Sequence, residues 1–172
     1  MGRFKHVNDV EQKDDGSLVY TGGLFEIYGD ANERKRTLLS FIVGTVLLAG
    51  LILLSGCINA DNATKSFTVI IPLVGEVSAA FVICWQAAKL IAGKGTVRHY
   101  VLDAMSEKIP TACKVLVVFA LIGMAFSVIY LFQHGTGGEV LKSLAYPVMK
   151  GLIASTAIGY EKFFHTIRWV KA

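Results

Sequence analysis

Two ionisable side chains, Glu76 and Lys150, lie inside otherwise apolar stretches of the sequence. A charged group in the middle of a membrane span costs about 3 kcal/mol on insertion scales, so such groups usually face the protein interior or water. Glu76 follows Phe67 by nine residues, and Lys150 follows Val140 by ten. At a helical rise of about 1.5 Å per residue, both lie roughly 14–15 Å along their spans. These depths are compatible with an ion pair between the two spans.

Three interpretations of Glu76 and Lys150 follow from their position. In the first, they form a static salt bridge that holds a helix bundle in register. In the second, they form a site for an ion, a proton or a small solute. In the third, Lys150 extends to the membrane surface and Glu76 meets another subunit.

Other residues support this intramembrane polar site. At about 100° per residue, Glu76 shares a helix face with Pro72, and Lys150 shares one with Tyr146 and Glu161. Pro72 and Pro147 lie one turn or less upstream of the charged residues. Each proline removes an amide donor and frees a carbonyl one turn back. That carbonyl can bind an ion, or it can accept a hydrogen bond from a neighbouring hydroxyl.

Small residues recur at helical spacing in the same stretches. Such stripes let helix backbones approach closely, and we expect them to serve packing within the chain more than oligomerisation. The stripes comprise Gly75 and Ala79, then Gly123 and Ser127, and finally Gly151, Ser155 and Gly159.

Four apolar segments position these residues. The 172-residue chain is 53% hydrophobic and 17% charged, against about 45–50% and 25% in a soluble domain. A membrane core requires about 20 apolar residues in helix. The sequence therefore predicts spans at residues 37–57, 67–92, 115–132 and 140–164, of which the last is the least apolar.

The positive charges predict an orientation for these spans. Of the 17 Lys and Arg residues, fourteen lie in the N-terminal tail, the central link and the C-terminal end. The two short loops have only Lys65, with Lys142 just inside the fourth span. Because basic residues accumulate on the cytoplasmic side, we expect both termini to be cytoplasmic. We predict a bacterial inner membrane as the location.

The expected fold is an all-α integral membrane protein with a bundle of four transmembrane helices. Residues 1–36 form a cytoplasmic tail, 37–164 the transmembrane domain with a cytoplasmic link at 93–114, and 165–172 a short cytoplasmic tail. Apolar residues at Leu24–Tyr28 and at Val97–Ile109 predict short amphipathic helices on the cytoplasmic surface. Sparse matches at shifts of 73 and 75 residues favour two duplicated helical hairpins, and Pro72 coincides with Pro147 in the second shift.

The composition excludes some functions and ranks others. Basic residues at a membrane surface explain the net charge of +4 better than nucleic-acid binding does. The sequence has no metal-ligand spacing, cofactor motif or catalytic motif. We therefore expect no metal and no cofactor, and we favour a non-enzymatic role over an enzymatic one. A lipid-acting enzyme would have to use polar groups at the cytoplasmic end of the fourth span, namely Glu161, Lys162, His165 and Arg168.

We therefore expect a small membrane protein that acts as an accessory, regulatory or assembly subunit through helix–helix contacts. The expected partners are the lipid bilayer and either a second copy or a larger membrane complex. The alternative is an oligomeric channel or transporter for an ion or small solute that uses Glu76 and Lys150.

Overall fold

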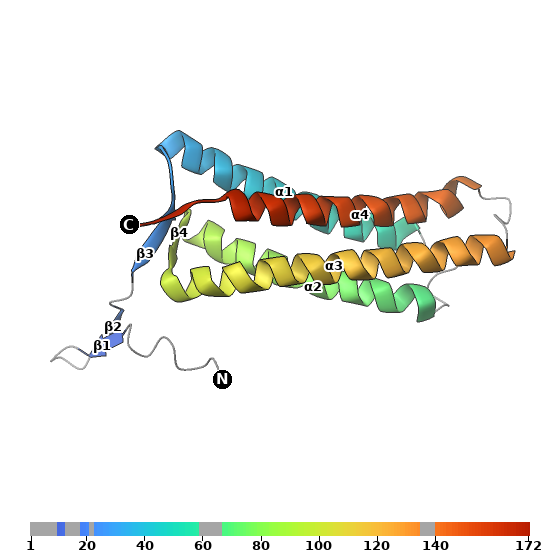
Figure 1. Cartoon of the computed structure of the whole chain (residues 1–172), viewed down its shortest axis with the longest axis horizontal. Helices are drawn as coiled ribbons and strands as arrows, with labels where there is room; N and C mark the ends of the chain where they lie inside the picture. The colour runs from blue at the N-terminus through green and yellow to red at the C-terminus, as the bar shows by residue number, and fades with distance from the viewer. Residues whose placement is uncertain (1–9, 13–17, 21–22, 59–66, 135–139) are drawn as a thin grey trace.

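The computed structural model describes residues 10–12, 18–20, 23–58, 67–134 and 140–172. Within them, four long helices pack into an antiparallel bundle (Figure 1). They are α1 (Ala31–Ile58), α2 (Phe67–Ala92), α3 (His99–His134) and α4 (Val140–Thr166). Each helix contacts its neighbours in the ring order α1, α2, α3, α4. These helices cover the four predicted spans, and α2 has the predicted bounds.

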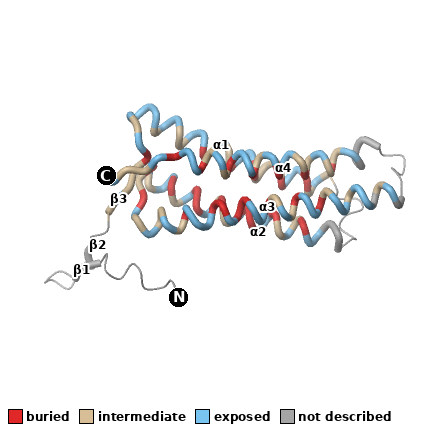
Figure 2. Tube along the Cα trace, viewed as in Figure 1, coloured by how far each residue is buried: buried red, intermediate tan, exposed pale blue. Residues whose placement is uncertain are grey.

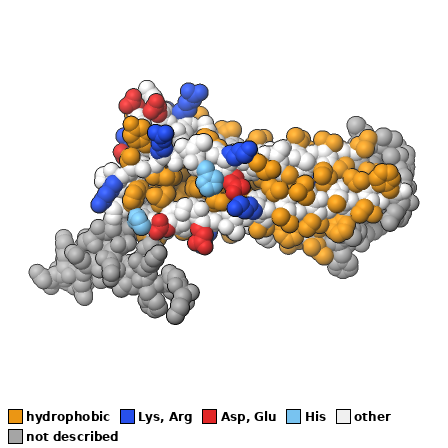
Figure 3. Space-filling model, viewed as in Figure 1, with side chains coloured by type: hydrophobic (Ala, Val, Ile, Leu, Met, Phe, Trp, Pro, Cys, Tyr) orange, Lys and Arg blue, Asp and Glu red, His pale blue; other side chains and the backbone are white. Residues whose placement is uncertain are grey.

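Three of the helices, α1, α2 and α3, are long and apolar enough to cross a membrane. Their outward faces have many large apolar side chains, while the buried residues line the inside of the bundle (Figure 2). Apolar side chains cover the half of the bundle away from the sheet, and the charged ones lie towards the sheet (Figure 3). The fourth helix has Lys150 in its middle together with several small and polar residues, which lowers its mean hydropathy.

A three-stranded antiparallel sheet closes one end of the bundle (Figure 1). Its central strand is β3 (Leu24–Ile27), with β4 (Thr96–Arg98) on one side and β5 (Trp169–Lys171) on the other. The sheet therefore joins the segment before α1, the link between α2 and α3, and the C-terminus. A separate pair of strands, β1 (Val10–Gln12) and β2 (Leu18–Tyr20), precedes it.

The prediction of a short amphipathic helix was wrong for Leu24–Tyr28, and for Val97–Ile109 it was right only from His99 onwards. The first predicted helix contains β3, and the second is divided between β4 and the first turns of α3. The helix that starts at His99 then continues without a break through Pro110 into the predicted third span. Ile27 and Val97 of the strands are buried, whereas Leu24 and Tyr28 are exposed, so the sheet covers only some of the apolar side chains that suggested surface helices. The predicted link at 93–114 is thus mostly helix.

The connection from α2 to β4 is a tight turn with a left-handed backbone. Gly95 donates its amide hydrogen to the carbonyl of Leu90 at 3.1 Å, and Lys94 donates to Ile91 at 2.9 Å. These bonds form a Schellman motif, which ends a helix with a residue in the left-handed region. Here that residue is Lys94, with a φ of 52°. The turn aims the chain back into the sheet within a few residues.

A second local motif fixes the start of α1 to the sheet. Asp30 precedes the helix, and its amide donates to Glu33 Oε2 at 3.3 Å, which is half of a capping box. Arg34 donates from Nε to the carbonyl of Gly29 at 3.0 Å and forms an ion pair with Glu26 of β3. The charges of the N-terminal segment therefore hold β3 and α1 together.

The two helical hairpins have similar surroundings, because a strand precedes each of them. However, the shift of 73 residues aligns Asp30, which precedes α1, with Asp103, which lies inside α3. That part of the sequence match relates residues with different structural roles. The duplication itself stays a prediction.

The left-handed backbone at Lys94 makes a prediction about stability. A residue with a Cβ atom is strained in this region by roughly 1–2 kcal/mol, whereas glycine is not. We expect Lys94→Gly to stabilise the protein by about 0.5–1 kcal/mol after the greater flexibility of unfolded glycine is included. We expect Lys94→Val to destabilise it. Thermal unfolding in detergent measures both, and a loss of stability in Lys94→Gly would contradict the role of this turn.

Candidate functional site

The centre of the bundle contains an ion pair between Glu76 of α2 and Lys150 of α4. The Lys150 Nζ atom lies 2.6 Å from Glu76 Oε2 and 2.8 Å from Oε1. Both side chains are 0% exposed. At these distances the lysine bonds to both carboxylate oxygens. Two buried charges need such close contact, because it offsets the loss of their hydration.

The other two helices complete the surroundings of this pair. Lys150 Nζ also donates to Ser55 Oγ of α1 at 3.4 Å, and it lies 4.9 Å from the centre of the Tyr146 ring. On α3, a Cβ atom added to Gly123 would lie 3.4 Å from Lys150 Cε and from Pro72 Cβ. Glycine at this position therefore leaves space for the lysine stem and the proline. All four helices contribute to the site.

The arrangement is closed and its charges are balanced. A lysine ammonium has three hydrogen-bond donors, and here it has three oxygen acceptors, two on Glu76 and one on Ser55. The positive charge also faces the Tyr146 ring, which is a favourable cation–π contact. The chemistry that this geometry supports best is a fixed link between helices, because neither charge has an exposed surface towards a ligand.

The sequence-predicted site residues divide into two groups. Pro72 and Tyr146 are buried beside the ion pair, and Pro147 is half-buried on α4. Glu161 belongs to a different place, since it lies towards the sheet end of α4 and pairs with Lys114 of α3 at 3.8 Å. Glu161 therefore does not support the Glu76–Lys150 site.

The small residues also divide into two groups. A Cβ atom on Gly75 would lie 2.5 Å from the Phe119 ring, Ala79 is buried, and Ser127 is half-buried. Gly75, Ala79 and Gly123 thus serve packing within the chain. In contrast, Cβ atoms on Gly151 and Gly159 would meet nothing within 4 Å, and Ser155 between them is exposed. The stripe on α4 faces outwards.

Sequence reasoning missed several contacts. Ser55 was one hydroxyl among many apolar residues of the first span, and only the fold brings it to Lys150. Thr45 and Tyr160 share a hydrogen bond of 2.8 Å between α1 and α4, and a Cβ on Gly44 would touch the Tyr160 ring at 2.8 Å. In the sequence, the only signal for this contact was that Gly44 and Thr45 are adjacent in the first span.

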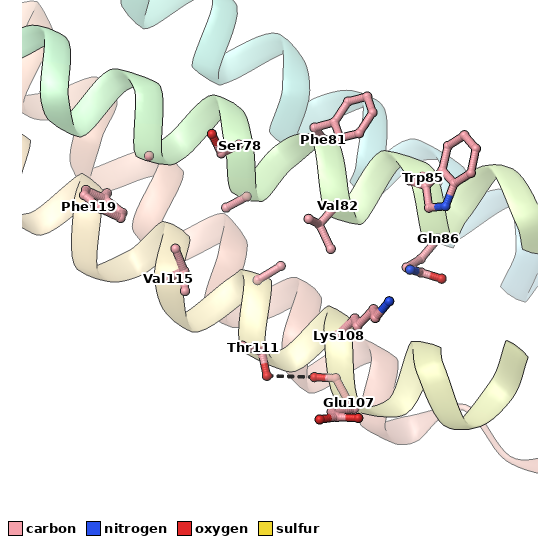
Figure 4. Close-up of a pocket in the computed structure, with 13 residues that line it drawn as sticks. Ser78, Phe81, Val82, Trp85, Gln86, Glu107, Lys108, Thr111, Val115 and Phe119 are labelled. Atoms are coloured by element: carbon pink, nitrogen blue, oxygen red, sulfur yellow. Dashed lines mark hydrogen bonds between the residues drawn. The ribbon is translucent and has the colours of Figure 1, made fainter. Parts of the chain in front are cut away.

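A groove lies on the bundle surface between α2 and α3 (Figure 4). Its volume is about 740 Å³, and it is lined by residues between Gly75 and Gln86 and between Glu107 and Phe119. Glu76 and Lys150 do not line it. The groove and the ion pair are therefore separate features.

Among the residues that the structure describes, no group of three or more His, Cys, Asp or Glu side chains could hold a metal ion. Comparison of the chain with known protein families, with curated proteins and with solved structures gave no match.

The ion pair makes a testable prediction about stability. Removal of one partner leaves the other charge buried and unpaired, which costs about 3–5 kcal/mol. We expect Glu76→Gln and Lys150→Met each to destabilise the protein by this amount, and the double variant to recover much of the loss because no lone charge remains. Thermal unfolding in detergent measures the three variants.

The pair between Lys114 and Glu161 offers a matched control. The Lys114 side chain is 71% exposed, and exposed ion pairs contribute at most about 1 kcal/mol. Lys114→Met should therefore have a small effect on unfolding. Additive losses in the Glu76–Lys150 double variant would show that the two charges do not depend on each other.

Proposed function

We propose that the protein is a membrane protein that serves as an accessory, regulatory or assembly subunit. It acts through contacts between its helices and those of a partner. The observation that carries this proposal is the outward stripe of Gly151, Ser155 and Gly159 on α4. Small residues on an exposed helix face let a second transmembrane helix approach closely. In this bundle, α4 does not use them for its own packing.

The membrane arrangement that belongs to this proposal has four spans and cytoplasmic termini. The fourth helix runs beside α3 along the bundle (Figure 1), so a membrane that α3 crosses would also enclose most of α4. The sheet collects the N-terminal segment, the central link and the C-terminus at one end. The predicted cytoplasmic charges occupy the same segments, and basic residues favour the cytoplasmic side. A bacterial inner membrane remains our proposed location.

The closed ion pair favours an assembly role over the channel or transporter alternative. A transport site must open to water on at least one side, whereas both charges here are enclosed by four helices. A static pair holds the bundle rigid and leaves the outer helix faces available for partners. The alternative function would require the pair to separate, at the cost of two unpaired buried charges.

The outward stripe predicts that partner contacts can be removed without damage to the fold. We expect the double variant Gly151→Leu with Gly159→Leu to remain folded, because its new side chains meet open space and leucine favours a helix over glycine by roughly 1 kcal/mol. The same variant should lose its association with a second copy or with a larger complex. Light scattering after gel filtration in detergent, together with copurification from native membranes, measures this loss. An unchanged assembly would contradict the proposal.

The inward glycine provides the opposite control. A Cβ at Gly75 would lie 2.5 Å from the Phe119 ring, so the ring or the helix must move. We expect Gly75→Ala to destabilise the protein by about 1–3 kcal/mol, and to change assembly only to the extent that the fold is lost. Comparison of unfolding temperature with assembly separates the two effects. Equal thermal stability in Gly75→Ala and the natural chain would show that this contact is not tight.

A further inference from the structure

The groove between α2 and α3 has an apolar body and a polar end. Gly75, Ala79, Val115 and Phe119 line one part, while Gln86, Lys108, Glu107 and Thr111 line the part nearer to the sheet. Figure 4 shows the Lys108 amine extending towards α2 and the Gln86 amide at the same end of the groove. Apolar and polar contacts are thus separated along its length, as they are in an amphiphilic molecule.

The dimensions of the groove match one leaflet of a membrane. Its lining extends from Gly75 to Gln86 on α2 and from Glu107 to Phe119 on α3, and at a rise of about 1.5 Å per residue these stretches are about 17–18 Å long. Half of a hydrocarbon core about 30 Å thick is roughly 15 Å. The volume of about 740 Å³ lies within the range of about 300–1,000 Å³ that is common for small-molecule sites.

One polar atom in the groove lacks a partner. Gln86 is 1% exposed, and its Oε1 atom accepts no hydrogen bond from the described residues. A buried carbonyl oxygen without a donor is unfavourable, and such groups normally have a protein, water or ligand partner. Because Gln86 lines the polar end of the groove, a molecule bound there can supply the missing donor.

The aromatic residues on the α2 side are consistent with the membrane surface at this level. Phe81 and Trp85 are exposed and stacked, with ring centres 6.5 Å apart. The Lys89 amine lies 5.6 Å from the centre of the Trp85 ring. Tryptophan and lysine are typical of the boundary between hydrocarbon and water. The polar end of the groove therefore lies at the level of lipid head groups.

From these observations we propose that the groove binds one phospholipid of the leaflet on the sheet side. One acyl chain lies between α2 and α3, the phosphate contacts Lys108, and a donor on the head group, a hydroxyl or an ammonium, bonds to Gln86 Oε1. The partner is a lipid because the charged side chains and the unpaired amide oxygen lie at one end only, while the Ser78 hydroxyl in the apolar part already donates to the carbonyl of Val74. A phospholipid with a choline head group has no hydrogen-bond donor and binds more weakly.

Native mass spectrometry of the full chain in detergent tests this proposal. The protein is mixed with equal amounts of phosphatidylglycerol, phosphatidylethanolamine and phosphatidylcholine that have identical acyl chains. We expect one retained lipid per chain, and about three- to tenfold less phosphatidylcholine than either of the other two lipids, as the loss of one hydrogen bond implies. Equal retention of all three lipids would overturn the proposed contact with Gln86.

Four variants locate the bound lipid. Ser78→Phe places a large side chain at an exposed position of the groove lining and should abolish retention of the lipid. Gln86→Leu should remove the preference among head groups, and Lys108→Gln should lower the retention of all three lipids. Lys162→Gln, at an exposed lysine of α4, is the control and should change nothing. Retention of one lipid in Ser78→Phe, or a chain that forms dimers and retains no lipid, would refute the site.

Discussion

The buried pair of Glu76 and Lys150 is the constraint on which the rest of the bundle depends. Two charges without any exposure to water are tolerated only if they meet closely and their remaining hydrogen-bonding atoms have partners. This requirement places α2 and α4 at one relative height, because the Nζ atom reaches both carboxylate oxygens. Ser55 adds α1 to the same level, and Gly123 adds α3 by leaving the space that the lysine stem occupies. Apolar contacts alone would allow the helices to slide along one another, whereas this cluster specifies one register.

The centre of the bundle and its sheet end are held by different kinds of interaction. The buried ion pair fixes the helices at the centre, while backbone hydrogen bonds of the sheet fix the end where the charged residues gather (Figure 3). A sheet of three short strands can be stable there because each strand is joined by a short connection to a helix that the bundle already positions. The left-handed turn at Lys94 and the capping contacts at Asp30 make these connections short. The helices and the sheet therefore position each other.

The sequence predicted the site best where burial of a single side chain has a large cost in free energy. A charge in an apolar stretch restricts its own surroundings so strongly that Glu76 and Lys150 could be singled out from depth alone. The helices were predictable for the same reason, because long apolar runs have few alternatives in a membrane. The sheet was not predictable, because β3, β4 and β5 have three or four residues each and obtain their partners from segments far apart in the chain. The partner of Glu161 and the contact of Ser55 also depend on the mutual rotation of helices, which spacing along one helix does not determine.

The ring order of the helices separates the two outer surfaces to which we assign partners. The groove lies between α2 and α3, whereas the stripe of small residues is on α4, which contacts α3 and α1. Glycine also has opposite consequences on these helices: Gly75 receives the Phe119 ring within the chain, while Gly151 and Gly159 leave open space outside it. A residue type that looks alike in the sequence thus closes one face and leaves another accessible. Since a lipid in the groove would not cover α4, the two proposed contacts can exist together on one rigid bundle.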